Sequence, residues 1–322
     1  MSLVLEKPIS IATPEAPPTE PAAIEESGAR AKKARMGAGF WIAVTWLVTV
    51  VFFAIFSRWL PFVKKEPDFL LMGADKQGFG TFSRSNIFGF DPETGRDLFS
   101  AVAMGAKNSL VIAFATVFIG FLVGGTLGMI AGYRGGIIDG VFSFIIAVLL
   151  STPPLLFILL LVAVLSAKDA SGMEQGLQSS VFKLSLSLGI LSIPTLFRIV
   201  RGATLSIGAR EFVLAARAMG AKTSRVLLRE ILPNVVKPML AYGLVGAGGV
   251  MVVEGSLSFL GVGVGQELAW GKIIESGRSL SNLRDNPQIS AVPGVILFFT
   301  VLSFNFIGDK IRERLEVKEG NI

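Results

Sequence analysis

Six segments of this chain are apolar over about the length that crosses a lipid bilayer. They comprise residues 40–62, 110–131, 141–167, 181–200, 240–264 and 291–307. A helix needs roughly 20 apolar residues to cross about 30 Å of hydrocarbon. The third segment contains Pro153 and Pro154, which predict a kink or a break. We therefore predict an all-α integral membrane protein with six transmembrane helices.

Composition supports this class and excludes others. Of the 322 residues, 52% are hydrophobic and 17% are charged, whereas soluble proteins average about 25% charged residues. The chain has no Cys and no His, which excludes disulfides, thiol catalysis and imidazole metal sites. The net charge of +6 would also suit a nucleic-acid partner. In a membrane protein, however, basic residues mainly mark cytoplasmic loops, so no nucleic-acid partner is expected.

The distribution of Lys and Arg predicts the orientation. Basic residues precede the first apolar segment and crowd the loop expected between the fourth and fifth segments: Arg30, Lys32, Lys33, Arg35, Arg198, Arg201, Arg210, Arg217, Lys222, Arg225, Arg229 and Lys237. The positive-inside rule then places both termini in the cytoplasm, and the first loop outside.

This orientation divides the chain into four parts. Residues 1–35, rich in Pro, Glu and Ala, are expected to be a disordered cytoplasmic tail. Residues 36–108 hold the first transmembrane helix and an extracytoplasmic segment. Residues 109–315 form the core, and residues 316–322 a second cytoplasmic tail.

The second apolar segment carries glycines in register. Gly120, Gly124, Gly128 and Gly132 recur every fourth residue and therefore share one helix face. Glycine is also simply common in membrane helices. The strict spacing favours a face against which another helix packs closely.

Glu254 is the one carboxylate well inside an apolar segment. An acidic side chain within the membrane indicates a functional site. Alternatively, the helix ends near Gly255, and Glu254 lies at an interface or bonds to a neighbour. The sequence leaves both interpretations open.

The sequence contains no pattern for catalysis or for binding a nucleotide or a metal. "GQELAWGKI" has the wrong spacing for a phosphate-binding loop, and Ile273 stands where that loop needs a hydroxyl. The acids of "DPETGRD" (residues 91–97) do not follow the calcium-loop pattern. We expect no catalytic residue, metal or cofactor in this chain.

The basic stretch "EFVLAARAMGAKTSRVLLREILPN" begins with a predicted helix over residues 211–221. Gly220 suits a helix end, and a second helical run over residues 224–232 is expected to stop at Pro233. Small residues would let such a helix enter a groove of another protein. Basic residues would equally suit an interfacial helix on anionic headgroups.

This stretch resembles the EAA signature of ABC-importer permeases. The residues on the pattern are Glu211, Ala215, Ala216, Gly220, Ile231, Leu232 and Pro233. "FGFDPETGRD", "GAKNSL", "EGSLSFLGVGV" with "WGKII", and "PGVILFFTVLSFNFIGDKIRERL" are similar to further segments of the second, C-type permease of dipeptide, oligopeptide and nickel importers. The resemblance covers nearly everything from residue 40 to residue 315.

The resemblance implies the type I ABC importer permease fold in the inner membrane. Such a permease pairs with a second, distinct permease, two ATPase subunits that use ATP and Mg²⁺, and an extracytoplasmic substrate-binding protein. Residues 211–221 would be the coupling helix. The outward segment with Asp91, Gly95, Arg96 and Asp97 would be a candidate contact for the binding protein.

The implied function is import of dipeptides and oligopeptides. Import of a nickel chelate is the alternative within the same family. An alternative of another class is a stand-alone secondary transporter or channel that uses Glu254.

Overall fold

The structure is a computed structural model that describes residues 37–73, 81–165, 180–265 and 267–319. The predicted tail over residues 1–35 and residues 320–322 of the predicted C-terminal tail lie outside the described residues. The elements in chain order are α2 (Ala38–Phe56), η1 (Phe69–Leu71), β1 (Phe90–Asp91), β2 (Arg96–Asp97), α3 (Leu98–Gly120), η3 (Phe121–Gly125), α4 (Thr126–Arg134), α5 (Gly136–Ser151), α6 (Pro154–Leu165), α7 (Ser180–Gly208), α8 (Glu211–Ala218), α9 (Thr223–Arg225), η4 (Val226–Ile231), α10 (Leu232–Phe259), α11 (Trp270–Ser276), α12 (Leu280–Asp285) and α13 (Gln288–Glu319).

The helices confirm a multi-pass membrane protein. Five described helices are long and apolar enough to cross a membrane, and the α5–α6 pair makes six if it counts as one span. This pair bends by 94° at its break. Pro153 and Pro154 explain the break, because neither has an N–H for a helical hydrogen bond and the ring obstructs the preceding turn. The predicted kink is confirmed.

The predicted span boundaries were too narrow in several places. α3 begins at Leu98 rather than near residue 110, because Asp97 caps it by accepting a hydrogen bond from the Ser100 N–H. It crosses residues 108 and 109, where the sequence suggested a division. α13 extends twelve residues beyond residue 307. Arg198 and Arg201, assigned to a loop, lie inside α7. Hydropathy marks the apolar part of a helix and misses its polar ends.

The predicted helix end at Pro233 was wrong. α9, η4 and α10 form one continuous 37-residue helical span, Thr223–Phe259. η4 is π-helical and ends at Ile231, two residues before Pro233. A π-helical turn has i→i+5 hydrogen bonds and re-routes the ladder where Pro233 supplies no N–H. The side-chain amide of Asn234 donates to the Glu230 carbonyl at 2.7 Å, which satisfies an acceptor there.

The four spaced glycines lie against α7. A Cβ at Gly124 would lie 2.5 Å from the Ile193 carbonyl oxygen, and one at Gly128 would lie 2.5 Å from that of Phe197. At Gly132 the Arg201 carbonyl oxygen would be 2.8 Å away, and at Gly120 the Ser192 side chain blocks the space. The predicted close-packing face is confirmed, with α7 as its partner. The contacted residues of α7 rise in number as the glycines do, from Ser192 to Arg201. The two helices therefore run in the same direction.

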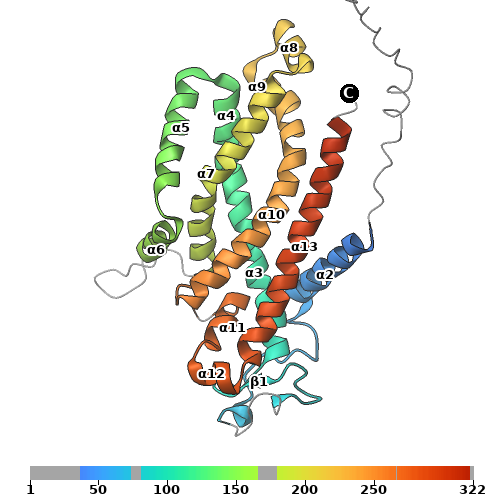
Figure 1. The fold of residues 1–322 in the computed structure, drawn as a ribbon, viewed down its shortest axis with the longest axis vertical. Helices are drawn as coiled ribbons and strands as arrows, with labels where there is room; N and C mark the ends of the chain where they lie inside the picture. The colour runs from blue at the N-terminus through green and yellow to red at the C-terminus, as the bar shows by residue number, and fades with distance from the viewer. Residues whose placement is uncertain (1–36, 74–80, 166–179, 266, 320–322) are drawn as a thin grey trace, which may run out of the picture. The chain divides into compact units, whose positions relative to one another are not determined.

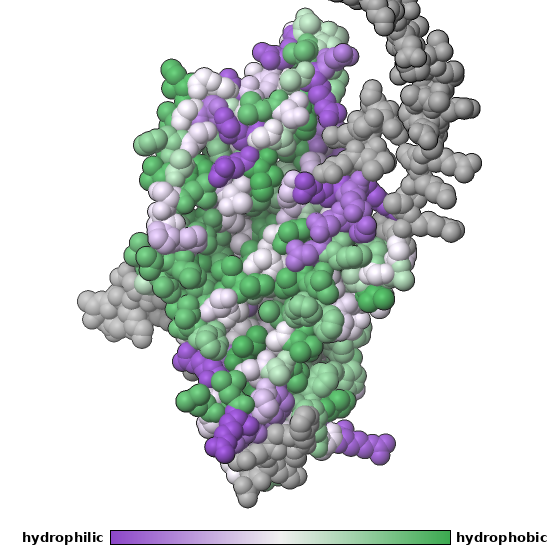
Figure 2. Space-filling model, in the orientation of Figure 1, coloured by the Kyte–Doolittle hydropathy of each residue, from purple (hydrophilic) through white to green (hydrophobic). Residues whose placement is uncertain are grey.

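Polar structure gathers at two ends of this helical unit. Figure 1 shows α8 and α9 at one end and α11, α12 and β1 at the other. The antiparallel pairing of β1 with β2 sets Phe90 opposite Asp97 and Asp91 opposite Arg96. Figure 2 shows hydrophobic residues across the middle of the visible face and most hydrophilic residues above and below them.

Candidate functional site

α8 forms a compact elbow between α7 and the helical span that starts at Thr223. Arg210 is extended before it, with φ −75° and ψ 149°. Gly220 follows it with φ +79°, and its N–H donates to the Arg217 carbonyl at 2.9 Å. A Cβ at Gly220 would meet nothing within 4 Å. Gly220 is therefore required for its left-handed backbone, which ends α8 as predicted, and not for space.

The underside of α8 is packed into the chain itself. Val213 is fully buried and Ala216 is 7% exposed. Val213 belongs to a core cluster with Val226, Ile231 and Val235, which come from η4 and α10. Ala216 is small enough for α8 to pack closely on the chain, and a larger residue there would push the helix away. α8 is therefore packed firmly on the core.

The exposed side of α8, with Met219 just after it, carries several apolar side chains beside the exposed Glu211. Phe212 is 41% exposed, Leu214 50% and Met219 82%, and Ala215 lies among them. Exposed apolar patches on a folded surface mark contacts with proteins or membranes. Arg217 points the other way, with its guanidinium 5.6 Å from the centre of the Tyr133 ring.

The residues on the EAA pattern therefore separate into two groups. Glu211, Ala215 and Gly220 lie at the surface, and so does Pro233. Ala216 and Ile231 are buried, and Leu232 is half-buried against the same cluster. A linear motif does not distinguish the two groups, since both faces of a short helix contribute to it.

At the opposite end, most of the outward-segment candidates shape their own loop. Asp91 accepts hydrogen bonds from the Glu93 N–H at 2.9 Å and the Thr94 hydroxyl at 2.7 Å. Asp97 caps α3 and also accepts from the Ser100 hydroxyl at 2.6 Å. Both carboxylates are buried, at 5% and 6% exposure.

The two remaining candidates differ from each other. Gly95 has φ +65°, and a Cβ there would strike the backbone of Asp68. The half-exposed Arg96 lines a surface cavity. Within the described ranges, no three His, Cys, Asp or Glu side chains are grouped as a metal site would need.

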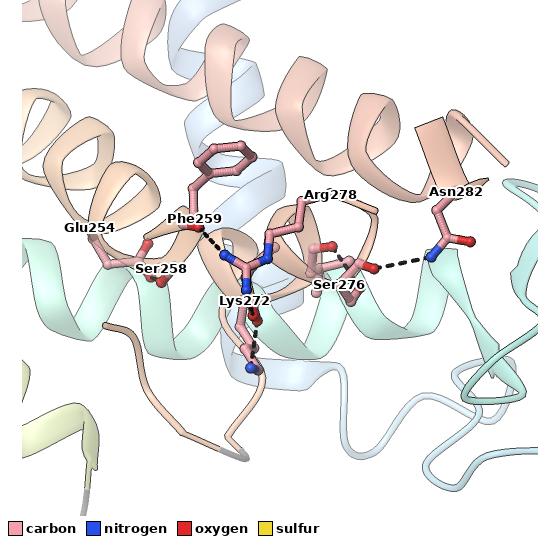
Figure 3. Close-up of polar contacts among 9 residues, drawn as sticks. Glu254, Ser258, Phe259, Lys272, Ser276, Arg278 and Asn282 are labelled. Atoms are coloured by element: carbon pink, nitrogen blue, oxygen red, sulfur yellow. Dashed lines mark hydrogen bonds and ion pairs between the residues drawn. The ribbon is translucent and has the colours of Figure 1, made fainter. Parts of the chain in front are cut away.

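A polar cluster around α11 and α12 was not found from the sequence. Arg278 donates to the Phe259 carbonyl at 2.8 Å, and Asn282 donates to the Ser276 carbonyl at 3.2 Å (Figure 3). Asn282 also donates to Glu93 at 2.9 Å. These bonds tie the end of α10 to α11, to α12 and to the β1–β2 loop. Their partners are up to 189 residues apart, so no local pattern reveals them.

Trp270 anchors α11 to α3. Its indole N–H donates to the Val102 carbonyl at 2.9 Å, and its backbone N–H donates to the Ser109 hydroxyl at 2.9 Å. The side chain is 1% exposed. The fixed position of α11 follows from these two bonds and from the burial of the ring.

Glu254 lies within this packed region, close to the end of α10. It is 1% exposed and accepts a hydrogen bond from the Ser258 hydroxyl at 3.0 Å (Figure 3). A Cβ at Gly271 would lie 2.6 Å from its Oε1, so α11 packs directly onto the carboxyl group. α10 continues to Phe259, which contradicts a helix end near Gly255. A functional role for Glu254 stays a prediction.

Two features lie between the ends. Arg201 of α7 forms a bidentate ion pair with Asp139 of α5, and its Nη2 lies 2.6 Å from Oδ2 of that carboxylate. A mostly apolar cavity of about 390 Å³ lies among α3, α6, α7 and α10, with Thr116, Thr195 and Tyr242 among its lining residues.

Comparisons with known proteins agree with this architecture. Residues 124–318 match the family model described as "Binding-protein-dependent transport system inner membrane component". The chain is 30% identical to the dipeptide transport system permease protein of Alkalihalophilus pseudofirmus over 97% of both chains. It is 32% identical to the oligopeptide transport system permease protein of Haemophilus influenzae, covering 86% of this chain and 85% of that one.

One further relative and one solved structure are also similar to this chain. A glutathione transport system permease protein of Pectobacterium atrosepticum is 34% identical over 70% of both chains. Among solved structures, an inward-facing MetNI methionine ABC transporter chain superposes with a TM-score of 0.53. The two chains are 22% identical, and the superposition covers 97% of the transporter chain and 67% of this chain. The structural likeness shows the fold.

Proposed function

Because the chain belongs to the family of binding-protein-dependent transport system inner membrane components, we propose that it is one of two permease subunits of an ATP-driven importer for dipeptides and oligopeptides. Its partners would be a second permease, two ATPase subunits and an extracytoplasmic binding protein. In this scheme ATP and Mg²⁺ bind to the ATPases, and this chain forms half of the pathway.

The observation that carries the proposal is the construction of α8. Its underside is fixed to the core through Val213 and Ala216, whereas Phe212, Leu214 and Met219 expose apolar surface. A partner that grips the exposed face can move the helices beneath it as one body. We assign α8 as the coupling helix, seated on an ATPase at the cytoplasmic end. The alternative is an interfacial helix, whose apolar side chains and basic residues would both contact the membrane surface.

The proposed pathway surface is the cavity lined by Thr116, Thr195 and Tyr242. The hydroxyls of Thr195 and Tyr242, set in an apolar wall, offer hydrogen bonds to a peptide backbone, whereas the buried Thr116 hydroxyl donates to the Ser185 carbonyl. The relatives named for dipeptides, oligopeptides and glutathione favour a peptide substrate. A nickel chelate is the alternative within the family. Direct metal binding is disfavoured because the chain has no His or Cys.

Reconstituted transport tests this function. The chain and its co-purified partners, placed in proteoliposomes with the binding protein, are expected to accumulate a labelled dipeptide only with ATP and Mg²⁺. The chain alone is expected to accumulate none. Accumulation by the chain alone, driven by an ion gradient, would contradict the proposal and support the secondary transporter.

Glu254→Gln tests the secondary transporter independently. Glutamine keeps the size of Glu254 and its ability to accept from Ser258. In the ABC importer we expect uptake within about twofold of the parent chain, since Glu254 serves packing against α11. An ion-coupled mechanism at Glu254 needs the carboxylate, and its loss would reduce uptake at least tenfold. Uptake of labelled peptide at matched protein levels separates the two.

A further inference from the structure

A groove between α2 and α3 has no role in the proposed transport cycle. It encloses about 700 Å³ and is lined mainly by apolar side chains. On α2 the lining residues Val51, Ala54 and Ile55 share one face, followed one turn later by Arg58. Val51 and Ile55 are exposed at 39% and 56%.

The α3 side of the groove has the same arrangement. Lys107, Val111 and Phe114 follow one another at helical spacing and line it together. Val111 is 44% exposed and Phe114 45% exposed. Each helix thus contributes an apolar wall with one cation at the same end.

A second cavity of about 790 Å³ adjoins that end and shares Arg58, Trp59 and Lys107 with the groove. Lys65 and Arg96 also line it, so four cations face one carboxylate, Glu267. None of the four cations forms an ion pair with any carboxylate in the part of the chain that the structure describes. Four cations around one carboxylate leave an excess of positive charge, and a further anion relieves the repulsion.

The position of this basic cavity matches the membrane surface. α2 ends at Phe56, and Trp59 beyond it is 75% exposed. Tryptophan and arginine at the end of a spanning helix are typical of the headgroup level. The apolar groove below is therefore at the depth of acyl chains.

We propose that this site binds one anionic phospholipid, with an acyl chain in the α2–α3 groove and the phosphate held by Arg58 and Lys107. In the proposed orientation it is a lipid of the outward leaflet. An apolar helix of another protein would fill the groove but leave the four cations with Glu267 as the one carboxylate that lines their cavity. A peptide in transit would pass the cavity near Thr116, which lies on a different face of α3 from Lys107, Val111 and Phe114.

Lipid retention by the assembled transporter tests this site. The complex is purified from bilayers of equal phosphatidylglycerol and phosphatidylcholine, and bound lipid is counted by native mass spectrometry. We expect phosphatidylglycerol to be enriched at least fivefold. Arg58→Ala with Lys107→Ala is expected to remove that enrichment, and Arg58→Lys to keep most of it because the charge remains.

Arg284→Ala is the matched control, because Arg284 is an exposed cation of α12 that lines neither the groove nor the basic cavity. It should retain the parent enrichment. Equal retention of both lipids by the parent complex, or undiminished enrichment in the double variant, would overturn the proposal.

A photoreactive amino acid at Val111 identifies the occupant directly. Val111 lies in the groove wall, one helical turn from Lys107 on the apolar side. A phospholipid adduct supports the site. An adduct with another protein subunit overturns it in favour of a helix–helix interface.

Discussion

Gly128→Ala is expected to destabilise the folded chain by about 3 kcal/mol, the upper range for forcing an extra group into a packed interior. The new methyl group would lie 2.5 Å from the Phe197 carbonyl oxygen and 3.1 Å from the Arg201 backbone nitrogen. Both are backbone atoms of α7, so no side chain can turn aside to make room. The helices must separate along the whole glycine row. We expect a lower melting temperature in detergent and little assembled transporter.

Gly140→Ala is the matched control for that change. Gly140 is also in a helix, and a Cβ there would meet nothing within 4 Å. Alanine favours a helix over glycine by about 1 kcal/mol, so this variant should be as stable as the parent or slightly more stable. Equal melting temperatures for the two alanine variants would contradict close packing of the glycine face.

Ala215→Glu is expected to abolish peptide uptake while the chain stays folded in the membrane. Ala215 lies on the exposed face of α8, among Phe212, Leu214 and Met219. A charged side chain there would have to be buried in an apolar groove of the ATPase, which disfavours docking. We expect at least a tenfold loss of ATP-driven uptake, with basal ATP hydrolysis by the ATPases retained.

Ala216→Glu, one residue away, should fail for a different reason. Ala216 is 7% exposed on the buried face of α8, so the carboxylate of the glutamate would be forced into the chain's own interior. This variant is expected to lose folded protein as well as uptake. Full uptake by Ala215→Glu, or identical folding defects in the two variants, would count against the assignment of α8.

Much of the fold could be predicted because the signals for membrane helices lie within short stretches of sequence. Apolar length predicts the spans, Pro153 and Pro154 predict the break between α5 and α6, and glycine spacing predicts a close-packed face. The partner of that face, α7, could not be predicted, since four-residue spacing describes only one of the two surfaces in contact.

The parts that were missed depend on tertiary contacts. A proline indicates a helix end, yet Pro233 is accommodated by the π-helical turn of η4 before it. Asp91 and Asp97 are acidic residues of the kind expected in an exposed binding loop. Each carboxylate instead turns inward and accepts hydrogen bonds from nearby N–H and hydroxyl groups. Ala216 and Ala215 are alike in sequence and differ only in which face of α8 they occupy.

Chemical cross-linking from α8 tests the central claim most directly. The chain has no cysteine, so Ala215→Cys provides its only thiol, to which a maleimide–benzophenone reagent can be attached. Photolysis of the assembled transporter should join this residue to an ATPase subunit, with a yield that changes when ATP binds. Val213→Cys, on the buried face of α8, should give no such product. Adducts from Ala215→Cys with lipid alone would contradict the account and identify α8 as an interfacial helix.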